Sequence, residues 1–175
     1  MAVQDYLMNQ VNPKDTQTVN DFLVQCLRDS VFVLDQTRLV HWGLIGSKFY
    51  QIHLLTDDIQ NELHKGIDTI AEHVRSINVM TPISVGDLLT TRIKDIKLED
   101  PFDQDKIILD LSIAHDMLAG CFEELAKYAG MIGDDLTQDL AVERGRVHKK
   151  NQWHLRATMT YMTKDPENNV EEGKS

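Results

Sequence analysis

The chain lacks the features of a membrane, secreted or disulfide-stabilised protein. Its 175 residues contain no apolar run approaching the roughly 20 residues that span a membrane. The N-terminus has no basic segment followed by an apolar one, as a signal peptide would. The two cysteines, Cys26 and Cys121, have no metal-binding spacing and are expected to be buried, reduced thiols. The sequence therefore predicts a single-domain protein of the cytoplasm.

Basic tails are also missing. Residues 1–18 contain Lys14 as their only basic residue, and residues 162–175 contain two lysines against four acidic residues. The net charge of the whole chain is −10. Affinity for duplex DNA comes mainly from neutralising phosphates, so this charge balance argues against DNA binding.

Apolar residues do recur at spacings of three and four, which is typical of amphipathic helices. They predict a helix over 19–44, which Gly43 and Gly46 end, and a second helix over 48–77 with Ser47 as its N-cap. The fold class expected from this pattern is all-α.

The second half of the chain predicts two more long helices after an extended connection. The connection covers 78–102 and includes a short helix at 85–91. Asp100 and Pro101 are expected to open the third long helix, which Gly130 and Gly133 end. The fourth covers about 135–160, and Gly145 within it indicates close packing or a kink. The expected domains are an N-terminal tail over 1–16, a bundle over 17–160 and an acidic tail over 161–175.

Five side chains of the types that bind iron lie in the first two helices: His41, His53, Asp57, Asp68 and Glu72. His53 and Asp57 share one helix face, and so do Asp68 and Glu72, because each pair is four residues apart. About three turns, or roughly 16 Å, separate the two pairs along the helix. Metal–ligand bonds are only about 2.0–2.2 Å long, so one chain cannot close both pairs on one ion.

An antiparallel second copy of the chain would complete the site. A two-fold axis near residue 62 or 63 places Asp57 of one chain opposite Asp68 of its partner. The short turn after the first helix brings His41 beside His53. Each composite site would then combine His41, His53 and Asp57 with the Asp68 and Glu72 positions of the second copy.

Simpler explanations exist for each residue taken alone. A single histidine on an apolar helix face is more often a packed core residue, and one Asp-x-x-x-Glu pair is more often a solvated surface. Five residues in two consistent half-sites favour the metal site. The Glu-x-x-His pairs of di-iron bundles with the site inside one chain are absent from the sequence, which argues against that type of centre.

These residues also carry a family resemblance. The segment 41–53, HWGLIGSKFYQIH, followed by Asp57 and by the segment 68–75, DTIAEHVR, resembles the motif of the Dps family of mini-ferritins. The resemblance extends over about residues 17–160. It implies a ferritin-like four-helix bundle with a long crossover between helices two and three, assembled into a hollow homo-dodecamer.

The resemblance also implies an activity, that of a ferroxidase protecting against oxidative stress. The five residues would form an intersubunit centre that oxidises Fe²⁺ to Fe³⁺, with hydrogen peroxide preferred to dioxygen, and the cage would store the ferric mineral. Zinc is a competitor for iron at this centre, because His64 and His73 are further imidazoles nearby. Metal identity, the roles of these two histidines and the subunit number are left open.

Several residues have secondary roles in this interpretation. Trp42 is either an electron relay beside His41 or a packing residue. The segment 133–140, GDDLTQDL, is similar to the family's pore segment, which implies that Asp134 and Asp139 line an iron-entry pore. The alternative is that these acidic residues only cap the fourth helix. Asp58 and Glu62 are candidates for mineral nucleation.

Two other functions compete with the ferroxidase. One is a Dps that binds DNA and protects the nucleoid, against which the acidic tails argue. The other is a catalytically silent helical cage or interaction module, in which the carboxylates only solvate one face.

Overall fold

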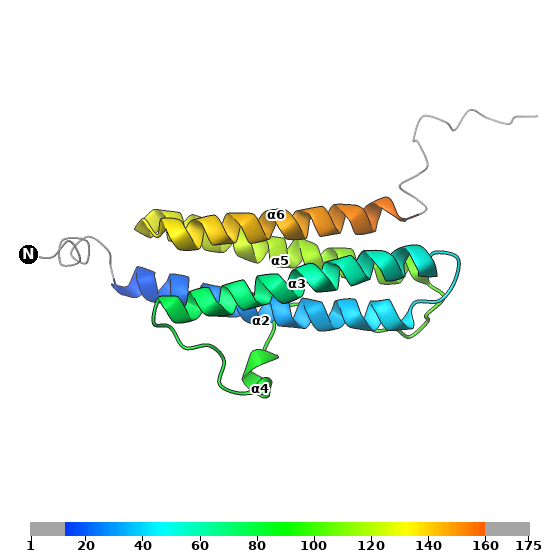
Figure 1. Ribbon diagram of the computed structural model, residues 1–175, viewed down its shortest axis with the longest axis horizontal. Coiled ribbons are helices and arrows are strands. Elements are labelled where there is room, and N and C mark those ends of the chain that lie inside the picture. The colour runs from blue at the N-terminus through cyan, green and yellow to red at the C-terminus, as the bar shows by residue number, and fades with distance from the viewer. Residues whose placement is uncertain (1–12, 160–175) are drawn as a thin grey trace, which may run out of the picture.

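The computed structural model describes residues 13–159. Within this range the helices are α2 (Pro13–Gly43), α3 (Phe49–Ser76), α4 (Val85–Leu88), α5 (Gln104–Ile132) and α6 (Asp135–Ala157). The four long helices lie side by side as a bundle, and the short α4 lies outside it (Figure 1). The chain is thus an all-α four-helix bundle, as predicted. The C-terminal tail predicted over 161–175 lies outside the described residues, and so does most of the N-terminal one.

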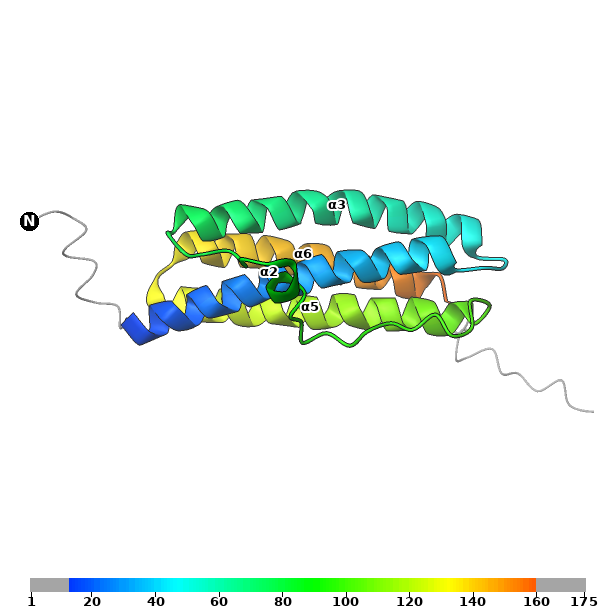
Figure 2. The ribbon, with the colours of Figure 1, turned by 90° about the horizontal axis from the view of Figure 1, so that it is seen from below.

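The connection between α3 and α5 crosses the length of the bundle. α2 and α3 are antiparallel neighbours joined by a short turn, and α5 and α6 form a second antiparallel pair (Figure 1). The segment between α3 and α5 runs back past α2, so α5 begins at the same end of the bundle as the α2–α3 turn (Figure 2). This long crossover with its short helix is the ferritin-like arrangement that the sequence predicted.

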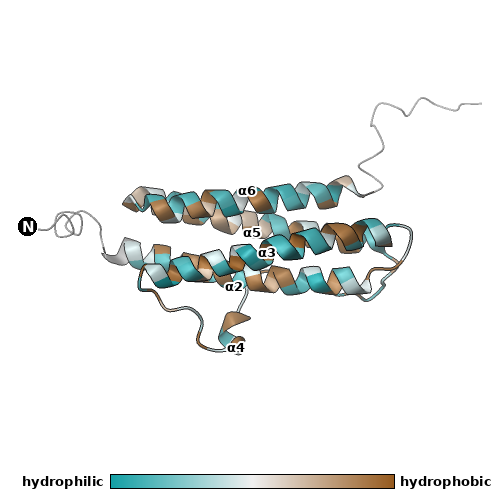
Figure 3. Cartoon of the chain, viewed as in Figure 1, coloured by the Kyte–Doolittle hydropathy of each residue, from teal (hydrophilic) through white to brown (hydrophobic). Residues whose placement is uncertain are grey.

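A continuous apolar core fills the space between the long helices. It includes fully buried residues from each pair, among them Leu23 of α2, Leu63 of α3 and Phe122 of α5. α6 is the most hydrophilic long helix (Figure 3), and it buries polar residues such as Arg144 and His148. Gly145 faces α5, but a Cβ there would lie at an ordinary contact distance, 3.6 Å from the Cβ of Phe122, so the packing does not require glycine. No helix among residues 13–159 is long and apolar enough to cross a membrane.

The predicted starts of three helices were wrong. α2 begins at Pro13 rather than at residue 19. Lys48, not Ser47, is the N-cap of α3, and it makes no side-chain cap. α5 begins at Gln104 with Asp103 as its cap, rather than at Asp100 and Pro101. The reason is that Pro101 belongs to the crossover turn, where its carbonyl accepts a hydrogen bond from the Ile45 amide at 3.0 Å. The predicted end is confirmed, since Gly133 is the left-handed C-cap with φ of 74°.

Candidate metal centre

The turn between α2 and α3 is held against the start of α5. The Lys48 amide donates to Oε1 of Gln104 at 2.7 Å, and the Lys48 ammonium pairs with Asp105. Gly46 makes this contact possible in two ways. Its φ of 123° is rare for residues with a side chain, and a Cβ there would lie 2.2 Å from Nε2 of Gln104. The turn therefore fixes how the end of α2 faces the beginning of α3.

His41 and His53 face each other across this turn. Their rings stack with centroids 3.8 Å apart and planes inclined by 20°. Nδ1 of His41 lies 3.1 Å from the His53 carbonyl oxygen, and Nδ1 of His53 lies 3.1 Å from the His41 carbonyl oxygen. The predicted proximity of the two residues is confirmed.

This reciprocal pairing determines which nitrogen of each ring remains available to bind a metal. A carbonyl oxygen can only accept a hydrogen bond, so each Nδ1 must carry the proton and donate it. In a neutral imidazole the lone pair is then on Nε2. Metal-binding histidines typically have one ring N–H held by a carbonyl or carboxylate while the other nitrogen binds the metal. The pair thus has the chemistry of a metal half-site.

The sequence analysis missed one residue of this arrangement, Thr56. Its side chain is fully buried in α3, and its hydroxyl lies 3.0 Å from Nδ1 of His41. The signal in the sequence was a polar residue on the apolar stripe of the second helix, between Ile52 and Ile59. Such a residue needs a partner when buried, and His41 supplies it.

The three predicted carboxylates, Asp57, Asp68 and Glu72, are exposed on α3. Asp57 lies one turn beyond His53, whereas the other two lie toward the far end of the helix. Within residues 13–159 of one chain, no three histidine, cysteine or acidic side chains are grouped closely enough to hold a metal ion. The structure therefore brings the two histidines together. The composite site, which a second chain would complete, stays a prediction.

Large apolar side chains surround the histidine pair at the surface. Trp42 is 70% exposed, Tyr50 72% and Leu54 49%. The beginning of α3, where two of these residues lie, is predominantly hydrophobic (Figure 3). Exposed apolar residues gathered in one place mark interaction surfaces. The role of Trp42 as a relay stays a prediction.

Asp134 caps α6, as the simpler interpretation proposed. Its carboxylate accepts a hydrogen bond from the Thr137 amide at 3.1 Å. Asp139 is exposed one turn further along the helix. The pore role of both residues stays a prediction.

The two candidate nucleation residues have different environments. Asp58 is exposed, whereas Glu62 pairs with the buried guanidinium of Arg144 on α6. Gly66 leaves the space for this guanidinium, because a Cβ there would lie 2.5 Å from Cζ of Arg144. Glu62 therefore holds α3 against α6 in addition to any contact with mineral.

The two additional histidines of α3 are engaged within the chain. Nε2 of His64 lies 2.8 Å from Nη2 of Arg38, and since arginine can only donate, His64 is the acceptor. Nε2 of His73 lies 2.8 Å from Oγ1 of Thr137 on α6. These contacts occupy Nε2 of both rings. Within residues 13–159, the Nε2 atoms of His41 and His53 are not occupied in this way.

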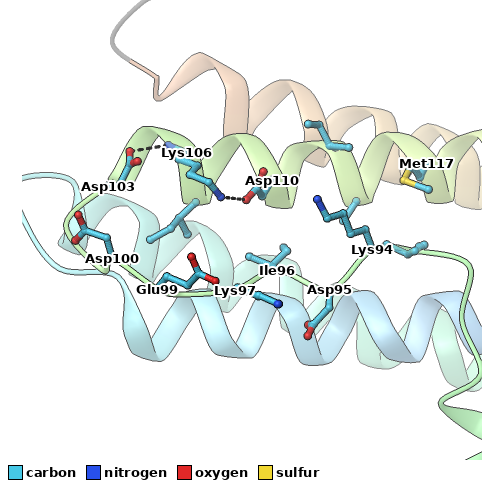
Figure 4. Close-up of a pocket in the computed structure, with 14 residues that line it drawn as sticks. Lys94, Asp95, Ile96, Lys97, Glu99, Asp100, Asp103, Lys106, Asp110 and Met117 are labelled. Carbon is cyan, nitrogen blue, oxygen red and sulfur yellow. Dashed lines mark hydrogen bonds and ion pairs between the residues drawn. The ribbon is translucent and has the colours of Figure 1, made fainter.

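A surface groove of about 650 Å³ lies elsewhere, between the crossover and α5. Charged residues line it, including Lys94, Asp95 and the Lys106–Asp110 ion pair at 2.7 Å (Figure 4). None of the five predicted ligands lines this groove. It is therefore separate from the candidate metal centre.

Comparisons with known proteins agree with this architecture. The ferritin-like domain family matches residues 20–164. The chain is 38% identical over 61 residues to an uncharacterised low-temperature-induced protein of Nostoc sp., a match that spans about a third of that relative, 34% of its length. It is 22% identical to the DNA protection during starvation protein of Listeria innocua, over 86% of this chain and 95% of that protein.

A solved structure extends the similarity to the whole fold. Dps from Thermosynechococcus elongatus superimposes with a TM-score of 0.79 at 20% identity, covering 90% of this chain and 98% of that one. The helix order and the crossover with its short helix are therefore features of a known class of fold. The chain belongs to the ferritin-like domain family, and Dps proteins are among its homologues.

Proposed function

We propose that the chain is a Dps-type mini-ferritin that oxidises Fe²⁺ at centres shared between two subunits and stores the ferric product in a dodecameric cage. The observation that carries the proposal is the His41–His53 pair. Each ring donates its Nδ1–H to the backbone carbonyl of the other residue, at 3.1 Å, and keeps Nε2 for a metal. The exposed apolar residues around the pair support a partner chain that covers it.

The ligand set suits Fe²⁺ as the substrate. His41 and His53 supply neutral nitrogens, and Asp57 supplies a negative oxygen one turn along α3. Asp68 and Glu72 of a second copy would add two more carboxylates from the opposite side. This charge stabilises the additional positive charge that develops as Fe²⁺ becomes Fe³⁺.

Two iron ions at one centre explain a preference for hydrogen peroxide. Two Fe²⁺ ions give up two electrons, which break the O–O bond of one peroxide molecule and yield two Fe³⁺ and two hydroxide ions. The hydroxyl radical, which forms when peroxide receives only one electron, is not released in this reaction. Dioxygen is the alternative oxidant, and zinc would compete with iron for the imidazoles.

The path and storage of iron form the rest of the proposal. Asp134 and Asp139 would attract Fe²⁺ at an entry pore, and Asp58 and Glu62 would nucleate the ferric mineral on the inner surface. The assembly would work in the cytoplasm as protection against peroxide.

DNA binding is not part of the proposal, although the name of the Listeria relative refers to DNA protection. Two of the basic residues of α6 are already paired with carboxylates within the chain. Arg144 is buried and paired with Glu62, and the Lys149 ammonium lies 2.7 Å from Asp116 and 3.7 Å from Glu123. Cationic groups already paired with carboxylates contribute little to phosphate neutralisation.

The test of the proposed function is iron oxidation by the purified assembly. Fe²⁺ added without oxygen and then mixed with peroxide should give rapid ferric absorbance in the parent. Replacing His53→Ala together with Asp57→Ala should slow this reaction strongly, because one half-site loses a nitrogen and an oxygen ligand.

The matched control replaces a histidine and an aspartate away from the turn, His154→Ala with Asp21→Ala, and should keep the parent rate. Equal rates for the ligand variant and the parent would contradict the site assignment. A parent rate no faster than free Fe²⁺ in buffer would contradict the activity itself.

A further inference from the structure

The hydroxyl of Thr56 combines contacts with two backbone carbonyls of its own helix and with an imidazole of α2. It lies 2.7 Å from the carbonyl oxygen of Ile52, one turn earlier in α3, 3.1 Å from the carbonyl oxygen of His53, and 3.0 Å from Nδ1 of His41 on α2. Thr37 also bonds a carbonyl one turn earlier, that of Val33 at 2.7 Å, but no contact between its hydroxyl and an imidazole occurs within the described part of the chain. A bond to the carbonyl four residues back is common for helical threonine, so the contact of Thr56 with His41 is the informative one.

The direction of both hydrogen bonds follows from the groups involved. Both carbonyls can only accept, and that of Ile52 is the nearer one, so the Thr56 hydroxyl donates its proton there. Its oxygen lone pairs then point away from that carbonyl and accept from His41. Nδ1 of His41 carries the proton because it also faces the His53 carbonyl oxygen at 3.1 Å. The His41 N–H is thus shared between two acceptors.

Burial makes this contact persistent. Thr56 is fully buried, and the β-branched side chain has few rotamers in a helix. The hydroxyl therefore cannot turn to solvent, and its acceptor side is fixed toward His41. The ring of His41 is only partly buried at the end of α2, and this contact holds it against a rigid side chain of α3.

We propose that Thr56 is a positioning residue for the metal half-site: its hydroxyl holds His41 in the tautomer and orientation that direct Nε2 toward the metal. This inference rests on the proposed function. Thr56 does not touch the metal, and it acts only through His41. Because it orients a ligand before the metal arrives, its loss should weaken metal binding itself and not only oxidation.

The test compares metal binding by Thr56→Val and Thr56→Ser with the parent assembly. Valine keeps the shape but removes the hydroxyl, and serine restores the hydroxyl. Co²⁺ without oxidant is the probe, measured by calorimetry and by its visible absorption. Loss of a group that orients a metal ligand typically costs about 10–100-fold in affinity. We expect a loss of about 10-fold for valine and a return close to the parent value for serine.

The control is Thr37→Val, which removes a buried hydroxyl of the same kind without touching His41. The Thr37 hydroxyl bonds the carbonyl of Val33 and makes no hydrogen bond to His41 among the described residues, so the variant should bind Co²⁺ like the parent, and circular dichroism melts should show that all variants remain folded. Equal Co²⁺ affinity in the parent and Thr56→Val would overturn the positioning role while leaving the proposed function in place.

Two other outcomes are equally decisive. Losses of affinity in Thr56→Ser and Thr37→Val as large as in Thr56→Val would show a general packing effect and overturn the inference. A parent that neither binds Co²⁺ nor oxidises Fe²⁺ would overturn the proposed function, and the inference with it.

Discussion

His115 and His148 form a buried imidazole pair between α5 and α6, away from the candidate metal centre. Their Nδ1 atoms lie 3.0 Å apart, so one ring must donate to the other, and the accepting ring must be neutral. Burial lowers the pKa of His115 from 6.5 to about 3. The pKa of His148 is also lowered, by burial first and then by the neighbouring His115 and Arg144.

This pair should make the folded chain sensitive to acid. Below pH 6.5 the unfolded chain binds protons on these histidines, whereas folded His115 stays neutral until about pH 3. The free energy of unfolding should therefore fall as the pH drops, by up to about 1.4 kcal/mol per pH unit for each histidine. Urea denaturation between pH 6.5 and 5, above the range where most carboxylates titrate, measures this slope.

The comparison needs a variant without the two titrating rings. His115→Leu with His148→Leu should give a flatter dependence on pH in this window, and His154→Leu, a half-buried histidine of α6, should keep the slope of the parent. The same slope in the double variant and the parent would show that the pair is not the source of the acid sensitivity.

At the scale of single residues, helical spacing was enough to predict the position of His41 and His53. Their contact depends on one short turn, which the glycines in the sequence indicate. Thr56 and the Glu62–Arg144 pair could not be predicted in the same way. Their partners lie on other helices, and which side chains meet across a bundle depends on the rotation of each helix about its axis.

Asp29 of α2 links the bundle to the crossover. It is fully buried, and its carboxylate accepts hydrogen bonds from the Thr91 hydroxyl at 2.9 Å and the Arg92 amide at 3.2 Å. The Arg92 guanidinium pairs with it at 3.2 Å, and the Cys121 thiol on α5 lies 3.7 Å away. Asp29 thus connects α2, the crossover and α5 at one point.

Replacing Asp29→Ala should destabilise the fold and loosen the crossover. The substitution leaves the Thr91 hydroxyl and the Arg92 amide without their acceptor, and each unsatisfied buried group costs about 1–3 kcal/mol. Arg92 is partly exposed and can be hydrated, so its pairing adds little. We expect a loss of about 3 kcal/mol in the free energy of unfolding, with faster hydrogen exchange at residues 91–93.

Asp21→Ala on the same helix is the matched control. Asp21 is exposed and accepts a hydrogen bond only from Gln17, at 2.8 Å, among the contacts of the described residues. Its loss should change stability by less than about 0.5 kcal/mol. If the two substitutions had equal effects, Asp29 would not be the link proposed here.

At the scale of elements, the apolar period predicted all four long helices, and the short helix expected at 85–91 is present as Val85–Leu88. Their starts were less predictable. Asp100 and Pro101 have the residue types of a helix start, but the Pro101 carbonyl is bound to the α2–α3 turn. That contact joins residues far apart in sequence, so the local pattern could not decide between Asp100 and Asp103, which are both suitable N-cap residues, and α5 starts after Asp103.

At the scale of the assembly, the spacing on α3 separates two half-sites that one chain does not join. His53 lies at the start of α3 beside His41 at the end of α2, and Asp68 and Glu72 lie toward the end of α3. If two chains complete each other, defects placed in different halves should complement one another in a mixed dimer. A site contained within one chain would show no such effect.

Mixing chains with His53→Ala and chains with Glu72→Ala should therefore restore activity. In a mixed dimer one site receives both damaged halves, and the other receives His53 from one chain and Glu72 from the other. Random pairing makes half of the dimers mixed, so about a quarter of all sites should be intact. Peroxide-dependent iron oxidation by co-expressed assemblies, compared with each variant alone, gives the measurement.

The control mixture combines His53→Ala with Asp57→Ala, which damage the same half. No mixed dimer of these chains contains an intact site, so activity should stay at the level of the single variants. Equal activity of the two mixtures, at equal native mass, would contradict the composite site.

The reciprocal pairing of His41 and His53 has a consequence for how this chain can change over evolutionary time. Each ring is anchored by the backbone of the other residue, and each leaves the same nitrogen available. Replacing either ring removes an imidazole and also the hydrogen bond that the ring makes to the carbonyl of the other residue. A lineage that loses one histidine gains nothing by keeping the other, so we expect the two positions to be inherited, or lost, together.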